Sequence, residues 1–153
     1  MTTEREIFEN RVAWCAAMRD PANLKGRHYL THITDTGRKD CCLGLACKTL
    51  GVKQKKDLMP IGLFLRYGNE ESFRYLPREG CVALNLTHGG NLTQEGVKIA
   101  KIFSDSNDAN CLAEFNDDVY SKDINLQGMG RLIERLFEEE YLFGVITLEP
   151  YQY

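Results

Sequence analysis

The sequence has no long apolar run and no strong excess of charge of one sign. No stretch approaches the roughly 18 consecutive apolar residues of a membrane-spanning helix. The net charge is −3 over 153 residues, which gives no support to general nucleic-acid binding through a basic surface. The N-terminal residues are charged and lack the apolar segment of an export signal. We therefore expect a protein that stays in the cytoplasm of the cell that makes it and has no membrane partner.

Familiar catalytic and metal-binding motifs are also missing. The sequence has no Walker loop, no Gly-x-Gly-x-x-Gly and no His-Glu-x-x-His, so nucleotide hydrolysis and zinc proteolysis lack support. Its six cysteines include no Cys-x-x-Cys pair. Without an export signal, reduced thiols are the expected state. We expect no metal and no cofactor, and most of the cysteines packed as small apolar side chains.

Length and composition indicate one globular domain. The hydrophobic fraction of 43% and the charged fraction of 27% are ordinary values, and we assign residues 1–153 to a single domain. The charge is unevenly divided, because residues 1–80 carry 14 Lys and Arg against 10 Asp and Glu, whereas residues 81–153 carry 5 against 12. The first half is therefore the better place for an anionic ligand and the second for a basic partner.

The apolar periodicity predicts an α+β fold, with N- and C-terminal amphipathic helices packed with a small, mainly antiparallel sheet. Thr3 and Glu6 form a capping box for the first helix. Asn125 is expected to cap a last helix over residues 126–140. Apolar residues at helical spacing predict the core faces of both helices. They are Ile7, Phe8, Val12, Cys15 and Met18 in the first helix and Leu132, Ile133 and Leu136 in the last.

A strand and a helix are predicted between residues 29 and 50. Residues 29–34 are rich in β-branched and aromatic side chains, which favours a strand. Asp40 is the expected N-cap of a helix that runs to Leu50. Gly44 lies inside this helix, where glycine costs about 1 kcal/mol relative to alanine. We interpret it as a site of close approach by another backbone or by a ligand.

Three further segments are harder to assign. Residues 53–56 are mostly lysine and are expected to form a solvated loop. Residues 145–148 contain β-branched side chains and predict a closing strand. Residues 97–103 fit either a helix that starts near Thr93 or a strand, because a short apolar run does not distinguish the two.

Four segments occur in order along the chain and carry a family resemblance. They are Trp14 within the first helix, Cys41-Cys42-Leu-Gly-Leu, Leu76-Pro77, and Leu112-Ala-Glu-Phe-Asn116-Asp117. Together they resemble a family of small uncharacterised proteins encoded by tailed bacteriophages. This sequence departs from the pattern with Phe115 in place of leucine and with Gly128 and Gly130 in the last helix. The family has no established activity, so the resemblance implies phage origin and the host cytoplasm, and little chemistry.

The resemblance and the charge distribution favour an accessory binding protein over an enzyme. Its expected partner is a host protein or a small anionic, nucleotide-like ligand, in a role that counters host defence. The expected ligand-binding residues are Arg27, Arg38 and Lys39, close in sequence to a helix N-terminus, and Tyr29, whose ring can stack on a base. The competing interpretation makes Arg38 and Lys39 the solvated edge of a hairpin. A homo-oligomer is left open.

The alternative hypothesis is a cysteine-dependent hydrolase that uses Cys41 or Cys42. A helix N-terminus can lower the pKa of a thiol, and both cysteines are expected at one. Asp40-Cys41 is similar to the Asp-Cys-Ser-Gly opening of the NlpC/P60 peptidases, offset by one residue and without their downstream His-Val-Gly strand. The competing interpretation is that both thiols fill the core. Thiol exposure distinguishes the two.

Histidines and carboxylates that could assist such a thiol are also present. His28 and His32 precede the helix and could face its N-terminal end. Asp117 or Asp118 could orient one of these rings. Cysteine, histidine and aspartate are the residue types that nucleophilic catalysis by a thiol requires.

Overall fold

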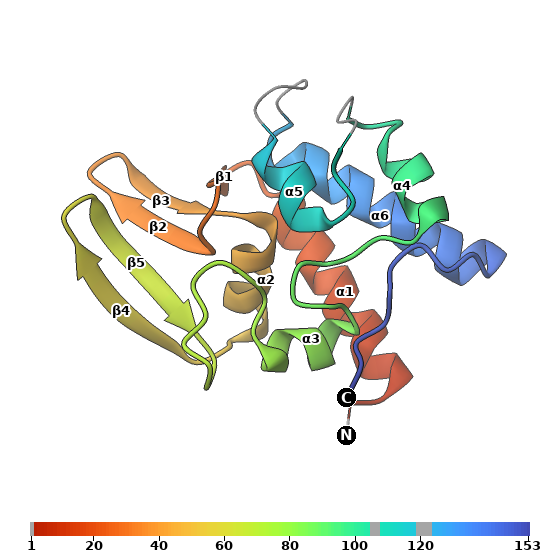
Figure 1. Ribbon diagram of the computed structural model, residues 1–153, viewed down its shortest axis with the longest axis horizontal. Helices are drawn as coiled ribbons and strands as arrows, with labels where there is room; N and C mark the ends of the chain where they lie inside the picture. The colour runs from red at the N-terminus through yellow and green to blue at the C-terminus, as the bar shows by residue number, and fades with distance from the viewer. Residues whose placement is uncertain (1, 105–107, 119–123) are drawn as a thin grey trace.

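The computed structural model describes residues 2–104, 108–118 and 124–153, which form an α+β fold (Figure 1). The helices are α1 (Glu4–Arg19), α2 (Cys42–Leu50), α3 (Arg78–Leu84), α4 (Gln94–Ala100), α5 (Leu112–Asp117) and α6 (Leu126–Phe143). The strands are β1 (Leu24–Lys25), β2 (Thr31–Thr34), β3 (Gly37–Asp40), β4 (Gln54–Met59) and β5 (Gly62–Tyr67). None of these helices is long and apolar enough to span a bilayer.

The five strands form one sheet in the order β1-β3-β2-β5-β4. Only the β1–β3 pair is parallel, so the prediction of a mainly antiparallel sheet is confirmed. The predicted loop at residues 53–56 is wrong, because residues 54–56 belong to β4, which pairs with β5. Their exposed polar side chains suit an edge strand, since charge there discourages pairing with other chains.

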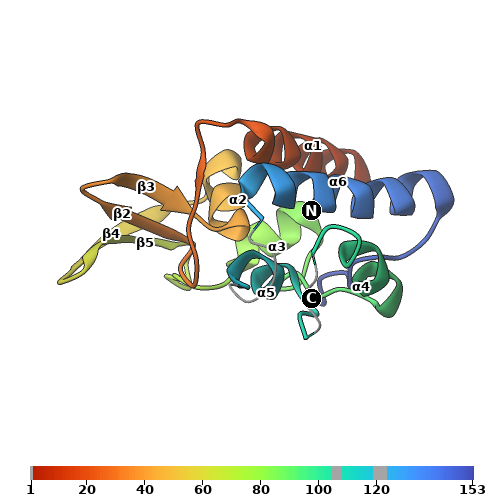
Figure 2. The same cartoon turned by 90° about the horizontal axis from the view of Figure 1, so that it is seen from above.

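Helix α2 lies between the sheet and the other helices, where it packs against α1, α3, α5 and β3 (Figures 1 and 2). Its N-cap is Cys41, and the predicted cap at Asp40 is wrong because Asp40 is the last residue of β3. Gly44 confirms the expected close approach: a Cβ atom there would lie 1.7 Å from the carbonyl oxygen of Leu30. The indole nitrogen of Trp14 donates to the carbonyl oxygen of Cys42 at 2.8 Å and links α1 to this helix.

Helices α1 and α6 run side by side in opposite directions (Figure 2). The predicted caps are confirmed, because Thr3 accepts from the backbone N–H of Glu6 and Asn125 from that of Gly128. The predicted core residues of α6 are confirmed as well, since Leu132, Ile133 and Leu136 are fully buried.

Part of the predicted core face of α1 is wrong. Phe8 is 46% and Val12 52% exposed, whereas Arg11 and Trp14 are buried with Met18. The helix is rotated so that Trp14 reaches α2 and Arg11 reaches the end of α3, where it donates to the Leu84 carbonyl. An apolar stripe is therefore left on the surface.

The structure shows which conformation residues 97–103 and 145–148 adopt. Residues 94–100 form helix α4, capped by the hydroxyl of Thr93, so the helix interpretation applies to most of residues 97–103. The predicted strand at residues 145–148 is wrong. Leu148 makes only an isolated bridge with Leu92, and Thr147 accepts a backbone hydrogen bond from Thr93.

Candidate functional site

The two cysteines of the hydrolase hypothesis lie in the core. Cys41 is 5% exposed and Cys42 is fully buried. The Cys41 sulfur accepts the N–H of Gly44 at 3.3 Å and so caps α2. Burial raises the pKa of Cys41 to about 12 and that of Cys42 well above its ordinary value, and it outweighs the hydrogen bonds that α2 offers. Both thiols are therefore inaccessible and protonated, which argues against a nucleophilic role.

The structure does not bring His32 to these thiols. Its ring stacks on Phe64 at 4.3 Å, and its Nε2 atom contacts the carbonyl oxygen of Ile61 at 2.9 Å. This is the face of the sheet opposite to Thr31, because successive residues of a strand point to opposite faces. Thr31 is buried beside Asp40, next to α2. Histidine and cysteine thus lie on different sides of the sheet.

His28 does meet one of the predicted carboxylates. Its Nδ1 atom lies 3.6 Å from the Asp117 carboxylate, which also accepts the backbone N–H of His28 at 3.1 Å. His28 has a left-handed backbone with φ of 69°, and the Asp117 hydrogen bond helps to hold that conformation. The predicted pairing of a histidine with Asp117 is therefore present, with an exposed His28, whereas both thiols are buried.

Arg38 belongs to a buried polar network rather than to an open ligand site. Its guanidinium donates to both carboxylate oxygens of Asp40, at 3.1 and 3.2 Å, and to the hydroxyl of Tyr67 at 3.0 Å. Asp40 is 2% exposed and also accepts from Thr31. These partners raise the pKa of Arg38, although partial burial of the guanidinium opposes them. Arg38 neutralises a buried carboxylate, which is a structural role.

The other predicted ligand-binding residues are separated from one another. Lys39 is exposed on the opposite face of the sheet from Arg38. Tyr29 packs against Phe64 at 4.6 Å and against Phe73 at 5.8 Å between ring centroids. These predicted residues do not form one site.

Arg27 lies in a pocket that we call the basic pocket. It has a volume of about 460 Å³ and contains three cationic side chains, from β1, the segment after it, and α6. The lining residues are Lys25, Arg27, Phe103, Ile124, Asn125, Gly128 and Arg131. None of these described residues is acidic. The described part of the lining is therefore cationic, which is the charge that an anion would match.

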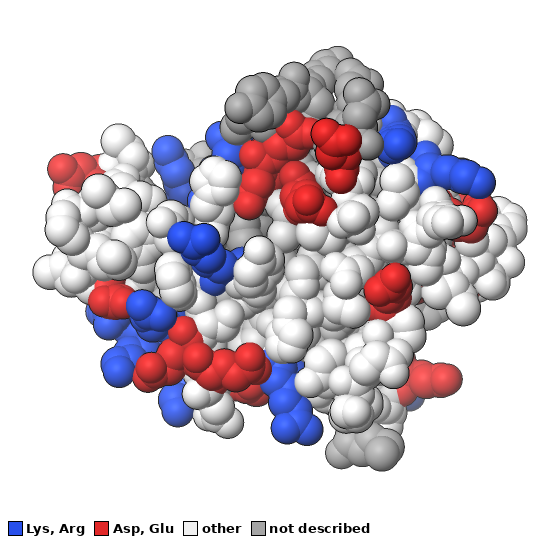
Figure 3. All heavy atoms as spheres, viewed as in Figure 1, with Lys and Arg blue, Asp and Glu red and all other residues white. Residues whose placement is uncertain are grey.

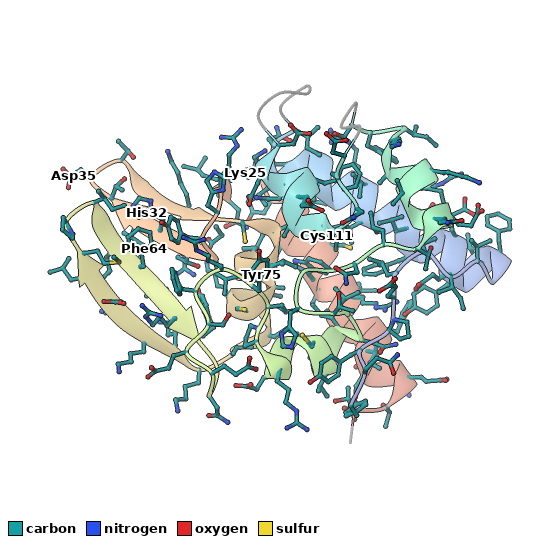
Figure 4. The ribbon with its side chains drawn as sticks, in the orientation of Figure 1. Lys25, His32, Asp35, Phe64, Tyr75 and Cys111 are labelled. Carbon is teal, nitrogen blue, oxygen red and sulfur yellow. The ribbon has the colours of Figure 1, made fainter. Side chains whose placement is uncertain are left out.

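Local structure fixes the walls of the basic pocket. The ammonium of Lys25 donates to the carbonyl oxygen of Ile124, which places β1 against the start of α6 (Figure 4). Asn125 is the N-cap of α6 and accepts the N–H of Gly128 at 2.8 Å. The 18-residue helix directs the positive end of its dipole here. Arg131 is exposed and makes no ion pair with another described residue.

A second, smaller pocket has mixed charge. It has a volume of about 220 Å³ and lies beside α5, where carboxylates gather on the surface (Figure 3). Its lining residues are His28, Arg74, Tyr75, Cys111, Ala113, Glu114 and Asp117, with Tyr75 and Cys111 labelled in Figure 4. Burial raises the pKa of Cys111 to about 11, and its thiol donates to Glu114 at 3.4 Å. This pocket matches an anion less well than the basic pocket.

The sequence could not indicate the basic pocket as a set. Only Arg27 was among the expected ligand residues, and Lys25 and Arg131 come from segments that meet only in the folded chain. Among the described residues, no group of three His, Cys, Asp or Glu side chains could hold a metal ion. No family model matches the chain, and no curated protein or solved structure is detectably similar to it.

Proposed function

We propose that this protein binds a small anionic ligand in the basic pocket, with Lys25, Arg27 and Arg131 as the cationic groups. One observation carries the proposal: three cationic side chains from separate parts of the chain line a single pocket, and no acidic side chain is among the described residues that line it. A charge-assisted hydrogen bond contributes about 1.5–3 kcal/mol to such binding. The helix dipole of α6 adds about 0.3–1 kcal/mol for a negative group near its N-terminus.

The lining also indicates the class of anion. The volume of about 460 Å³ falls within the ordinary range for small-molecule sites. Phe103 and Ile124 give the pocket an apolar side beside the cations. A ligand with a phosphate and a planar ring would use both, since aromatic side chains stack on nucleobases. A mononucleotide or a cyclic dinucleotide is the ligand class we propose.

The biological role follows from the resemblance to phage proteins and is proposed with it. Capture of a nucleotide signal inside an infected cell would suit a small phage accessory protein, because removal of the signal requires binding and no chemistry. This proposal includes the host cytoplasm as the place of action. A binding role needs no reactive thiol, which agrees with the burial of Cys41 and Cys42.

Isothermal titration calorimetry with inorganic phosphate, AMP and cyclic di-AMP tests the proposal. Arg131→Ala should weaken nucleotide binding about tenfold, which corresponds to about 1.4 kcal/mol. Arg135→Ala is the matched control, because Arg135 lies one turn further along α6 and pairs with Glu139 at 3.0 Å. Equal effects of the two substitutions, or no binding of any probe by the wild-type protein, would contradict the proposal.

A further inference from the structure

A groove between α1 and α6, which we call the apolar groove, is separate from the basic pocket. It has a volume of about 410 Å³ and a mostly apolar lining. Phe8 and Val12 are 46% and 52% exposed on the α1 side, and Tyr141 and Leu142 are 48% and 71% exposed on the α6 side. Large exposed apolar patches on globular proteins mark interaction sites.

Buried contacts hold the floor of the apolar groove. The Arg11 guanidinium lies 4.4 Å from the centre of the Phe137 ring, and its Nε atom donates to the Leu84 carbonyl at 2.9 Å. The rings of Phe8 and Tyr141 meet edge to face at 5.1 Å across the two helices. The groove is thus formed before any partner arrives, which lowers the entropy cost of binding.

The rim of the groove is acidic on its α6 side. Glu134 and Glu138 line it from α6, one turn apart. Glu134 pairs with Arg19 at 2.6 Å, whereas Glu138 is exposed and makes no ion pair with any residue in the described parts of the chain. Glu134 is thus neutralised within the chain, and Glu138 is left as an exposed negative charge at the edge of the groove. A cation from a partner would pair with Glu138.

We propose that the apolar groove binds an amphipathic helix of another protein, with apolar side chains against Phe8, Val12 and Leu142 and a Lys or Arg beside Glu138. Helices α1 and α6 lie side by side and form the two walls of the groove, which is the shape in which helices are commonly bound. A second copy is disfavoured, because a two-fold interface would place the same acidic rim on both sides. An anionic membrane is disfavoured by the same charge.

Two synthetic peptides of about 18 residues, long enough for five helical turns, provide the probe. They share one leucine pattern and differ in having lysine or glutamate at the polar positions. Fluorescence anisotropy with the full chain should show binding of the leucine–lysine peptide at least about tenfold tighter than of its glutamate counterpart. Val12→Gln replaces an exposed apolar side chain with an uncharged polar one and should weaken that binding about tenfold, with circular dichroism confirming the fold.

A matched pair of charge removals tests the role of Glu138. Glu138→Gln should weaken peptide binding about threefold, whereas Asp35→Asn, on the distant β2–β3 turn, should leave it unchanged. Binding that is insensitive to Val12→Gln, or equal for both peptides, would overturn the proposal. A wild-type dimer in sedimentation that Val12→Gln dissociates would assign the groove to a second copy instead. Arg131→Ala should not change peptide binding, which separates this test from that of the basic pocket.

Discussion

Gly44→Ala probes the contact on which the position of α2 depends. An alanine Cβ at this position would lie 1.7 Å from the carbonyl oxygen of Leu30 and 2.4 Å from its carbonyl carbon. Both atoms are backbone, so no side-chain rotation can relieve the overlap. Helix α2 would have to move away from the strand that follows Leu30, and the hydrogen bond from the N–H of Cys41 to the same oxygen, now 3.0 Å, would lengthen.

The expected loss follows from three terms of known size. Forcing extra volume into a packed core costs about 1–3 kcal/mol, and here the upper end applies because backbone meets backbone. Weakening the Cys41 hydrogen bond costs about 1 kcal/mol. The better helix propensity of alanine returns about 1 kcal/mol. The free energy of unfolding should therefore fall by about 3 kcal/mol. For a chain of this length, that loss lowers the melting temperature by about 6–12 °C.

Urea denaturation followed by Trp14 fluorescence measures this loss, because the Trp14 indole donates to the Cys42 carbonyl at 2.8 Å and reports on the α1–α2 contact. Gly130→Ala is the matched control within α6. There the nearest atom would be the Cβ of Met18, at 3.0 Å, so a small shift of the helix suffices. A Gly44→Ala protein as stable as Gly130→Ala would refute the packing argument.

Three other predictions concern the core and its titratable groups. Native protein should react with Ellman's reagent at pH 8 far more slowly than unfolded protein, which exposes all six thiols, whereas fast labelling of Cys41 or Cys42 would restore the hydrolase hypothesis. Leu136→Ala should cost about 2–5 kcal/mol in chemical denaturation, since Leu136 is fully buried, and a loss below about 0.5 kcal/mol would place it on the wrong face. Burial raises the pKa of Glu140 despite Arg11, so the folded state holds this proton more tightly than the unfolded state. Wild-type stability relative to Glu140→Gln should therefore be highest in acid and fall as pH rises through the raised pKa, and urea titrations at several pH values that show a rise instead would contradict this assignment.

Local signals in the sequence predicted the helix ends well. Thr3 and Asn125 are caps whose function depends on a side chain and a backbone N–H three residues away, so the chain specifies them without help from the rest of the fold. Gly44 was also informative, because a glycine inside a helix has a cost that a close contact explains. The same local rules selected Asp40 as a cap. Arg38, two residues earlier in β3, and Thr31 of β2 hold that carboxylate instead.

The candidate site was harder to predict because neighbouring residues diverge in space. Arg27 lines the basic pocket, His28 meets Asp117, and Tyr29 packs on Phe64. Arg38 and Lys39 point to opposite faces of the sheet, as consecutive strand residues must. Because these residues are close in sequence, we expected them to form one site. In the folded chain they lie at several separate places. The predicted core face of α1 was partly wrong for a related reason. Periodicity identifies an apolar stripe on a helix, but it does not show which part of that stripe a neighbouring helix covers.

Three of the four segments on which the proposed phage resemblance rests meet in the structure, where their contacts support the fold. The fully buried Asn116 accepts the N–H of Cys42 at 3.1 Å and donates to the carbonyl oxygen of Gly26 at 3.0 Å. Gly44 lets the same helix touch Leu30. Proteins that share these motifs are therefore expected to share the arrangement of α2 and α5, whatever they bind. A function specific to this chain must then depend on residues outside the motifs, and the basic pocket and the apolar groove are two such places.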